Sequence, residues 1–161
     1  MRYDLTFAQE PPEGSTSANH LKAADTNLVM REITYPSVER IVELNVLALS
    51  FIQAKRADRA HVMSPARIEQ VLDECKRHSG DVYDKAVVLL KGIVQKHPFE
   101  SGNRRTAFVA TKEFLILNGG KLGIADEASN ARILLGIREN YYADDEIKEW
   151  IHHGKIRAFE R

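Results

Sequence analysis

A ten-residue stretch from His97 to Thr106 gathers a proton acceptor, a glycine and two adjacent arginines. Histidine titrates near neutral pH, so His97 could remove a proton from an attacking hydroxyl group. Arg104 and Arg105 carry charged, forked donors that suit the oxygens of a phosphate group. These residue types, in this order, favour a site that binds a phosphate and acts on a hydroxyl.

Two helical patterns flank this stretch and would position its side chains. Apolar residues recur at three- and four-residue steps over 81–96, and Pro98 disfavours helical geometry at His97, so the first helix should end there. Gly102 permits a tight turn, after which a second helix is expected over 103–118. The N–H groups that start a helix lack partners and form an anion site. Arginines oppose the helix dipole there, which suggests either a bound anion or a carboxylate partner from elsewhere in the fold.

Similar patterns predict an all-α bundle. The stretch from Thr106 to Leu117 is apolar around much of its circumference, so other helices should surround it. The turn before it would then lie at the start of a buried central helix, and a small extended element is expected near 31–36 or 55–63. Further helices are expected over 37–54, 65–78 with Ser64 as N-cap, 129–140 and 144–153.

Composition restricts the class of protein. Residues 1–30 are rich in turn formers and should form an N-terminal extension that is loop or partly disordered, before a single domain over 31–161. Net charge is zero, with 23 residues of each sign, which argues against bulk electrostatic binding of nucleic acid or of an anionic membrane. No membrane span or signal peptide is evident, and the single Cys75, interpreted as structural, is consistent with a reducing cytoplasm.

The stretch that begins at His97 resembles the core motif of the Fic/Doc family, His-Pro-Phe-x-acid-Gly-Asn-(Gly or Lys)-Arg. Its flanks resemble the Doc-type (death-on-curing) branch, and the resemblance extends more weakly from about Ile33 to Trp150. It identifies 31–161 as a Fic/Doc domain. The flanking residues that carry it are Tyr83-Asp84-Lys85-Ala86, Leu89-Leu90, Arg105-Thr106-Ala107, Phe114-Leu115 and Leu117-Asn118-Gly119.

The resemblance implies a role for each matching residue. His97 matches the base that deprotonates a target hydroxyl, Gly102 and Asn103 match positions that hold nucleotide phosphates, and Arg105 matches an arginine that contacts a phosphate. Arg104 stands where AMP transferases carry Gly and the Doc branch carries Lys. A large cation there would crowd the pocket used for AMP transfer.

The implied function is transfer of phosphate from a nucleotide to a Ser, Thr or Tyr hydroxyl of a target protein, as in a toxin-type regulator. ATP or another nucleoside triphosphate would be the co-substrate, together with Mg²⁺. Two alternatives stay open. One is AMP transfer to a protein hydroxyl, although the second arginine of many AMP transferases is here Phe108. The other is a nucleotide-binding regulatory protein with weakened catalysis.

The metal position departs from the family pattern. Ser101 replaces the Asp or Glu that holds Mg²⁺ in the family, and a serine hydroxyl is a weak, neutral ligand. Either the adjacent Glu100 supplies the missing carboxylate, or phosphate oxygens supply most of the metal ligands, or the metal site is weakened.

The resemblance also implies partners. The segment over 55–63 matches a flap that positions the target peptide, with Lys55, Arg56, His61 and Val62 as its candidate residues. Doc-type proteins commonly pair with a separate antitoxin. The family's own inhibitory motif, Ser/Thr-x-x-x-Glu-Gly/Asn, does not occur in this sequence, so self-inhibition by that device is not expected.

Overall fold

The structure is a computed structural model that describes residues 32–51 and 58–160. The expected N-terminal extension over 1–30 lies outside the described residues, as do Lys55 and Arg56 of the predicted flap. The described part of the chain forms the helices α1 (Val38–Phe51), α2 (Pro65–Arg77), α3 (Val82–Lys96), α4 (Asn103–Leu117), α5 (Asn130–Arg138) and α6 (Asp144–His153).

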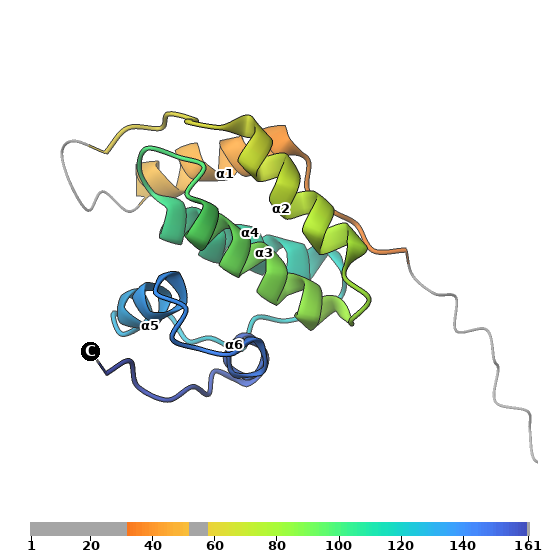
Figure 1. The fold of residues 1–161 in the computed structure, drawn as a ribbon, viewed down its shortest axis with the longest axis vertical. Coiled ribbons are helices and arrows are strands. Elements are labelled where there is room, and N and C mark those ends of the chain that lie inside the picture. Colours follow the sequence, from red (N-terminus) through yellow and green to blue (C-terminus); the bar gives the residue numbers. More distant parts are fainter. Residues whose placement is uncertain (1–31, 52–57, 161) are drawn as a thin grey trace, which may run out of the picture. The chain divides into compact units, whose positions relative to one another are not determined.

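The helices are arranged in three layers (Figure 1). The central layer is the pair α3 and α4, with α1 and α2 on one side and α5 and α6 on the other. The described residues contain no strand, and the expected all-α bundle is confirmed. Because α3 and α4 follow each other directly, the loop that joins them lies at one end of the central layer.

Local signals fix both ends of α3. The Asp81 side chain accepts hydrogen bonds from the backbone N–H groups of Tyr83 and Asp84, which caps the helix start. At the other end His97 is left-handed, with φ 52° and ψ 59°, so the helix stops before Pro98 as expected. Leu89, Leu90 and Ile93, all fully buried, hold α3 in the core, so the position of His97 is fixed by a well-packed helix.

The central helix α4 is buried along one side only. Ala107, Ala110, Phe114 and Leu115 lie in the core at 0–1% exposure, whereas Ile116 is 60% exposed. Phe108 and Val109 are half-buried and line a cavity. The expectation that other helices surround α4 therefore holds for its core face, and part of its remaining apolar surface is available to a ligand.

The expected extended element is reduced to a single bridge. Val62 pairs with Phe99 as an isolated antiparallel β-bridge. The N–H of Met63 donates to the carbonyl oxygen of Pro98 at 2.8 Å, and the N–H of Glu100 donates to the carbonyl oxygen of His61 at 2.9 Å. Of the two segments considered, the one that contains 61–63 makes the bridge, and it lies along the loop between α3 and α4.

Two smaller expectations have different outcomes. Ser64 has the extended backbone of an N-cap before Pro65, but its side chain makes no cap hydrogen bond. Cys75 is 1% exposed, and burial raises the pKa of its thiol to about 11. A buried thiol with a raised pKa stays protonated at neutral pH, as the structural interpretation expects.

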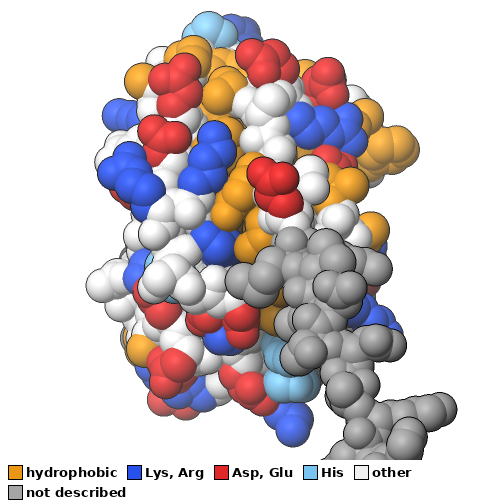
Figure 2. Space-filling model, turned by 90° about the vertical axis from the view of Figure 1, so that its right-hand side faces the viewer, with side chains coloured by type: hydrophobic (Ala, Val, Ile, Leu, Met, Phe, Trp, Pro, Cys, Tyr) orange, Lys and Arg blue, Asp and Glu red, His pale blue; other side chains and the backbone are white. Residues whose placement is uncertain are grey.

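The face of the described residues in Figure 2 carries no dominant charge. Figure 2 shows acidic and basic side chains interspersed over the face that it presents. This matches the net charge of zero and provides no broad basic field for nucleic acid on that face. Among the described helices, none has the length and apolar character needed to span a bilayer.

Candidate active site

Buried hydrogen bonds shape the loop that precedes α4. Asn45, 1% exposed on α1, donates through Nδ2 to the carbonyl oxygen of Ser101 and to Oγ1 of Thr106, both at 2.9 Å. The Thr106 hydroxyl in turn donates to the carbonyl oxygen of Gly102 at 3.0 Å. The loop is thus tied to α1 and to the first turn of α4, and its shape is set before any ligand binds.

Gly102 is required here for two reasons. Its φ of 80° is left-handed, which favours glycine. A Cβ atom at this position would also lie 2.9 Å from Cδ2 of Leu49 and 3.0 Å from Nδ2 of Asn45. No side chain caps α4 at this N-terminus, so the helix start keeps its capacity to bind an anion.

Asn103 uses its side chain to hold the loop. Its Oδ1 accepts from the N–H of Phe99 at 3.0 Å, and its Nδ2 donates to the carbonyl oxygen of Phe99 at 2.7 Å. The side chain is 4% exposed. Both ends of the Asn103 amide are therefore engaged with the backbone of Phe99.

The surroundings of His97 favour its neutral form. It is half-buried at the end of α3, and its carbonyl oxygen accepts from Nη1 of Arg67 at 3.2 Å. Burial lowers the pKa of the imidazole, and the charge of Arg138 lowers it further, with smaller effects from Arg67 and Arg104. A hydrogen bond to the Val94 backbone acts in the opposite direction. A lowered pKa keeps the ring uncharged at neutral pH, which is the state that can accept a proton.

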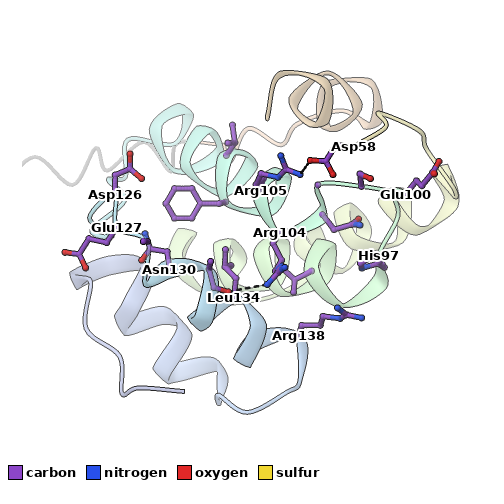
Figure 3. A pocket seen from close by; sticks show the side chains of 18 residues that line it. Asp58, His97, Glu100, Arg104, Arg105, Asp126, Glu127, Asn130, Leu134 and Arg138 are labelled. Atoms are coloured by element: carbon purple, nitrogen blue, oxygen red, sulfur yellow. Dashed lines mark hydrogen bonds and ion pairs between the residues drawn. The ribbon is translucent and has the colours of Figure 1, made fainter. Parts of the chain in front are cut away.

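A cavity of about 630 Å³ opens beside the loop, between α4 and α5. This volume is within the range of pockets that hold small-molecule ligands. His97, Glu100 and Ser101 line it, and so do all four residues from Gly102 to Arg105. Opposite them stand residues of α5 and of the segment before it, including Asn130 and Leu134 (Figure 3).

The two arginines of α4 enter this cavity with partners. Nη2 of Arg105 lies 2.6 Å from Oδ2 of Asp58, and the two side chains are 19% and 15% exposed. Nη1 of Arg104 donates to the carbonyl oxygen of Ala131 at 3.3 Å, which places its guanidinium against α5. Of the two explanations that the sequence left open for arginines at a helix start, the carboxylate partner therefore exists for Arg105.

Charge is unevenly distributed along the cavity. Figure 3 shows Asp126 and Glu127 at one end, His97 and Arg138 at the other, and Arg104 between them. An anionic group is therefore favoured at the end that carries His97, while the apolar side chains and Asn130 are left for the uncharged part of a ligand.

The described residues do not form an ordinary magnesium site. No group of three or more His, Cys, Asp or Glu side chains among them could hold a metal ion. Ser101 lines the cavity without a carboxylate, and Figure 3 shows the Glu100 side chain directed away from Arg104 and Arg105. Mg²⁺ is usually held by one or two carboxylates together with substrate phosphates, so Ser101 leaves Glu100 as the carboxylate of this loop that lines the cavity.

The structure brings most of the predicted site residues together. His61 and Val62 pair with the loop through their backbones but do not line the cavity. Sequence reasoning missed Asp58, Asn45 and Arg138. Asn45 could have been found, because it is a polar residue on the apolar face of α1 beside Leu44. Asp58 and Arg138 look like solvated charges in the sequence, and no local pattern distinguishes them.

Comparison with known proteins identifies the family of the chain. The family model described as Fic/DOC family matches residues 19–115, which contain α1 to α3, the loop and most of α4. No curated protein matches the chain.

Proposed function

Because the chain belongs to the Fic/DOC family, we propose that it transfers the terminal phosphate of a nucleoside triphosphate to a hydroxyl group of a target protein. Members of this family are typically enzymes that transfer nucleotide-derived groups to proteins. Transfer of phosphate, as in the Doc branch, is the specific form proposed for this chain. A toxin role, a separate antitoxin and a cytoplasmic location stay predictions from the sequence.

Arg104 is the observation that carries this choice. A glycine at this position would leave space at the helix start, whereas the arginine extends from α4 to the backbone of α5. The guanidinium thereby fills volume between the helix start and α5, and it adds a positive charge between the acidic end of the cavity and the end that carries His97. This supports binding of a terminal phosphate next to the base, and it disfavours placing a bulky nucleoside monophosphate group there.

The chain's own residues account for the transfer. The oxygen of the target hydroxyl forms a bond to the γ-phosphorus, and His97 takes the hydroxyl proton. The bond from that phosphorus to the bridging oxygen breaks, and the nucleoside diphosphate leaves with the electron pair. The start of α4 and the arginines Arg104 and Arg105 bind the phosphate oxygens, where they offset charge in the transition state.

Differential labelling of ATP tests the proposal. The purified protein is incubated with a lysate of candidate targets and with ATP labelled at either the α- or the γ-phosphate. Label from the γ-phosphate on a protein is the expected result. Label from the α-phosphate would instead show AMP transfer, and no label from either, with nucleotide bound, would show a regulatory binding protein.

Ser101→Asp should lower the magnesium concentration needed for half-maximal activity by roughly tenfold. Substitutions beside metal ligands typically change metal affinity by about this factor or more. A carboxylate is a hard anionic ligand for Mg²⁺, and serine brings no charge. Magnesium titrations of turnover for wild type, Ser101→Asp and Glu100→Gln provide the measurement, with the exposed Ser79→Asp as control.

The pair of variants separates the alternatives for the metal. If Glu100 already supplies a ligand, Glu100→Gln raises the magnesium requirement and Ser101→Asp changes little. A higher magnesium requirement in Ser101→Asp would contradict the idea that this position faces the metal.

Asp58→Asn should raise the affinity for a nucleoside triphosphate about two- to tenfold. Asp58 pairs with Arg105, so a phosphate must displace this carboxylate and tolerate its charge. Calorimetric titration with ATP measures the change, and Asp73→Asn, an exposed ion-pair carboxylate on α2, is the control. A loss of affinity in Asp58→Asn would instead mean that Asp58 holds Arg105 in its binding orientation.

A further inference from the structure

Arg138 is a cation of the cavity that the sequence motif does not include. It lies in the last turn of α5 and lines the same cavity as His97 and Arg104. Figure 3 shows its side chain near His97, at the basic end of the cavity. Unlike the arginines of α4, it makes no hydrogen bond or ion pair with any of the described residues.

Packing fixes the place of Arg138 relative to His97. Nε2 of Gln95, on α3, donates to the carbonyl oxygen of Ile137 at 3.0 Å. Ile137 is fully buried and Leu134 is 6% exposed, so the end of α5 is anchored in the core. Gln95 precedes His97 by two residues and Ile137 directly precedes Arg138, so one hydrogen bond links the two backbone segments that carry the base and the cation.

Electrostatics indicate that His97 and Arg138 face the same space. Among the charged groups that lower the pKa of His97, Arg138 has the largest effect, ahead of Arg67 and Arg104. Coulomb interactions weaken with distance and with solvent screening. The order therefore indicates that Arg138 has the strongest electrostatic interaction with the imidazole among these cations. Protonation of His97 is therefore unfavourable unless an anionic group lies near both side chains.

The arginines of α4 have partners within the protein. Arg105 pairs with Asp58, and Arg104 donates to the carbonyl oxygen of Ala131. A phosphate group that binds beside His97 can contact the guanidinium of Arg138. The described residues offer no competing partner for this guanidinium. Guanidinium groups bind phosphate oxygens through charge-assisted hydrogen bonds that are about twice as strong as neutral ones.

We propose that Arg138 is a further catalytic residue, which binds an oxygen of the phosphate group being transferred beside His97. This inference rests on the proposed function. In the transfer step the phosphate gains a bond to the target oxygen while His97 becomes positively charged. Arg138 then stabilises the equatorial oxygens of the transferring group, and these oxygens in turn offset the repulsion between Arg138 and the protonated His97.

The test compares wild type with Arg138→Gln and Arg138→Lys in the full chain, using ATP and a protein target identified by γ-phosphate labelling. Arg138→Gln should lower kcat roughly 10- to 100-fold, with a smaller change in KM, because the contact strengthens in the transition state. Arg138→Lys should recover part of the rate. Arg77→Gln removes the same charge from an exposed site on α2 and should leave turnover unchanged.

A second measurement does not depend on turnover. NMR titration of the His97 ring should show a higher pKa in Arg138→Gln than in wild type, because a nearby positive charge has been removed. Wild-type labelling together with unchanged kcat in Arg138→Gln overturns this inference and leaves the proposed function intact. A wild-type protein that binds no nucleoside triphosphate and labels no target contradicts the proposed function, and the role of Arg138 falls with it.

Discussion

Replacing His97 with alanine should lower the rate of phosphate transfer about 10²–10⁴-fold, which is the usual contribution of a positioned general base. The residue lies at the end of α3 beside the start of α4, and burial and Arg138 keep its pKa below the ordinary histidine value. Transfer measured with γ-labelled ATP and a fixed target gives the rate. Wild-type turnover in a folded His97→Ala protein would remove this residue from the mechanism.

A second variant separates catalysis from backbone geometry. His97 has φ 52°, a left-handed conformation that alanine adopts less readily than asparagine. His97→Asn keeps the turn and removes the base, so it should be as inactive as His97→Ala while its thermal unfolding stays closer to wild type. His153→Ala, at an exposed histidine of α6, should retain full activity.

The same residue predicts the pH profile. His97 accepts a proton only when neutral, so kcat/KM should fall as the pH drops through its lowered pKa. Activity should therefore persist to a more acidic pH than an ordinary histidine would allow, and this limb of the profile should disappear in His97→Asn.

Replacing Arg105 with alanine should weaken binding of a nucleoside triphosphate roughly 10- to 100-fold, because a charge-assisted hydrogen bond contributes about 1.5–3 kcal/mol. The loss has two sources. The guanidinium is removed, and the carboxylate of Asp58 remains in the cavity, where it repels phosphate. Calorimetric titration with ATP measures the affinity, and Lys112→Ala removes an exposed cation from the same helix as control.

The double variant Arg105→Ala/Asp58→Asn isolates the second source. It should bind ATP more tightly than Arg105→Ala alone and less tightly than wild type. From the sequence, Lys55→Ala and Arg56→Ala are expected to weaken binding less than Arg105→Ala does. Equal affinities for wild type and Arg105→Ala would mean that Arg105 serves the structural ion pair with Asp58 and not a nucleotide.

Local sequence signals located the helices and the loop well. The ends of α3 and α4 follow from Pro98, from Gly102 and from the glycines after Asn118, because these residues restrict or release the backbone where they stand. The motif from His97 to Arg105 also indicated the family, because its residues are contiguous and their types and order are visible in the sequence without the fold.

Tertiary structure alone decided the charge around that turn. Asp58 meets Arg105 across 47 positions of sequence, and Arg138 approaches His97 from a helix that begins far beyond the motif. Asn45 reaches Ser101 from α1 across 56 positions. Periodicity describes which face of a helix is buried, but it carries no information on which distant charges that burial brings together. The sequence by itself located the candidate base and the helix start proposed to bind phosphate, and the packing of α1 and α5 against the central pair determined which residues surround them.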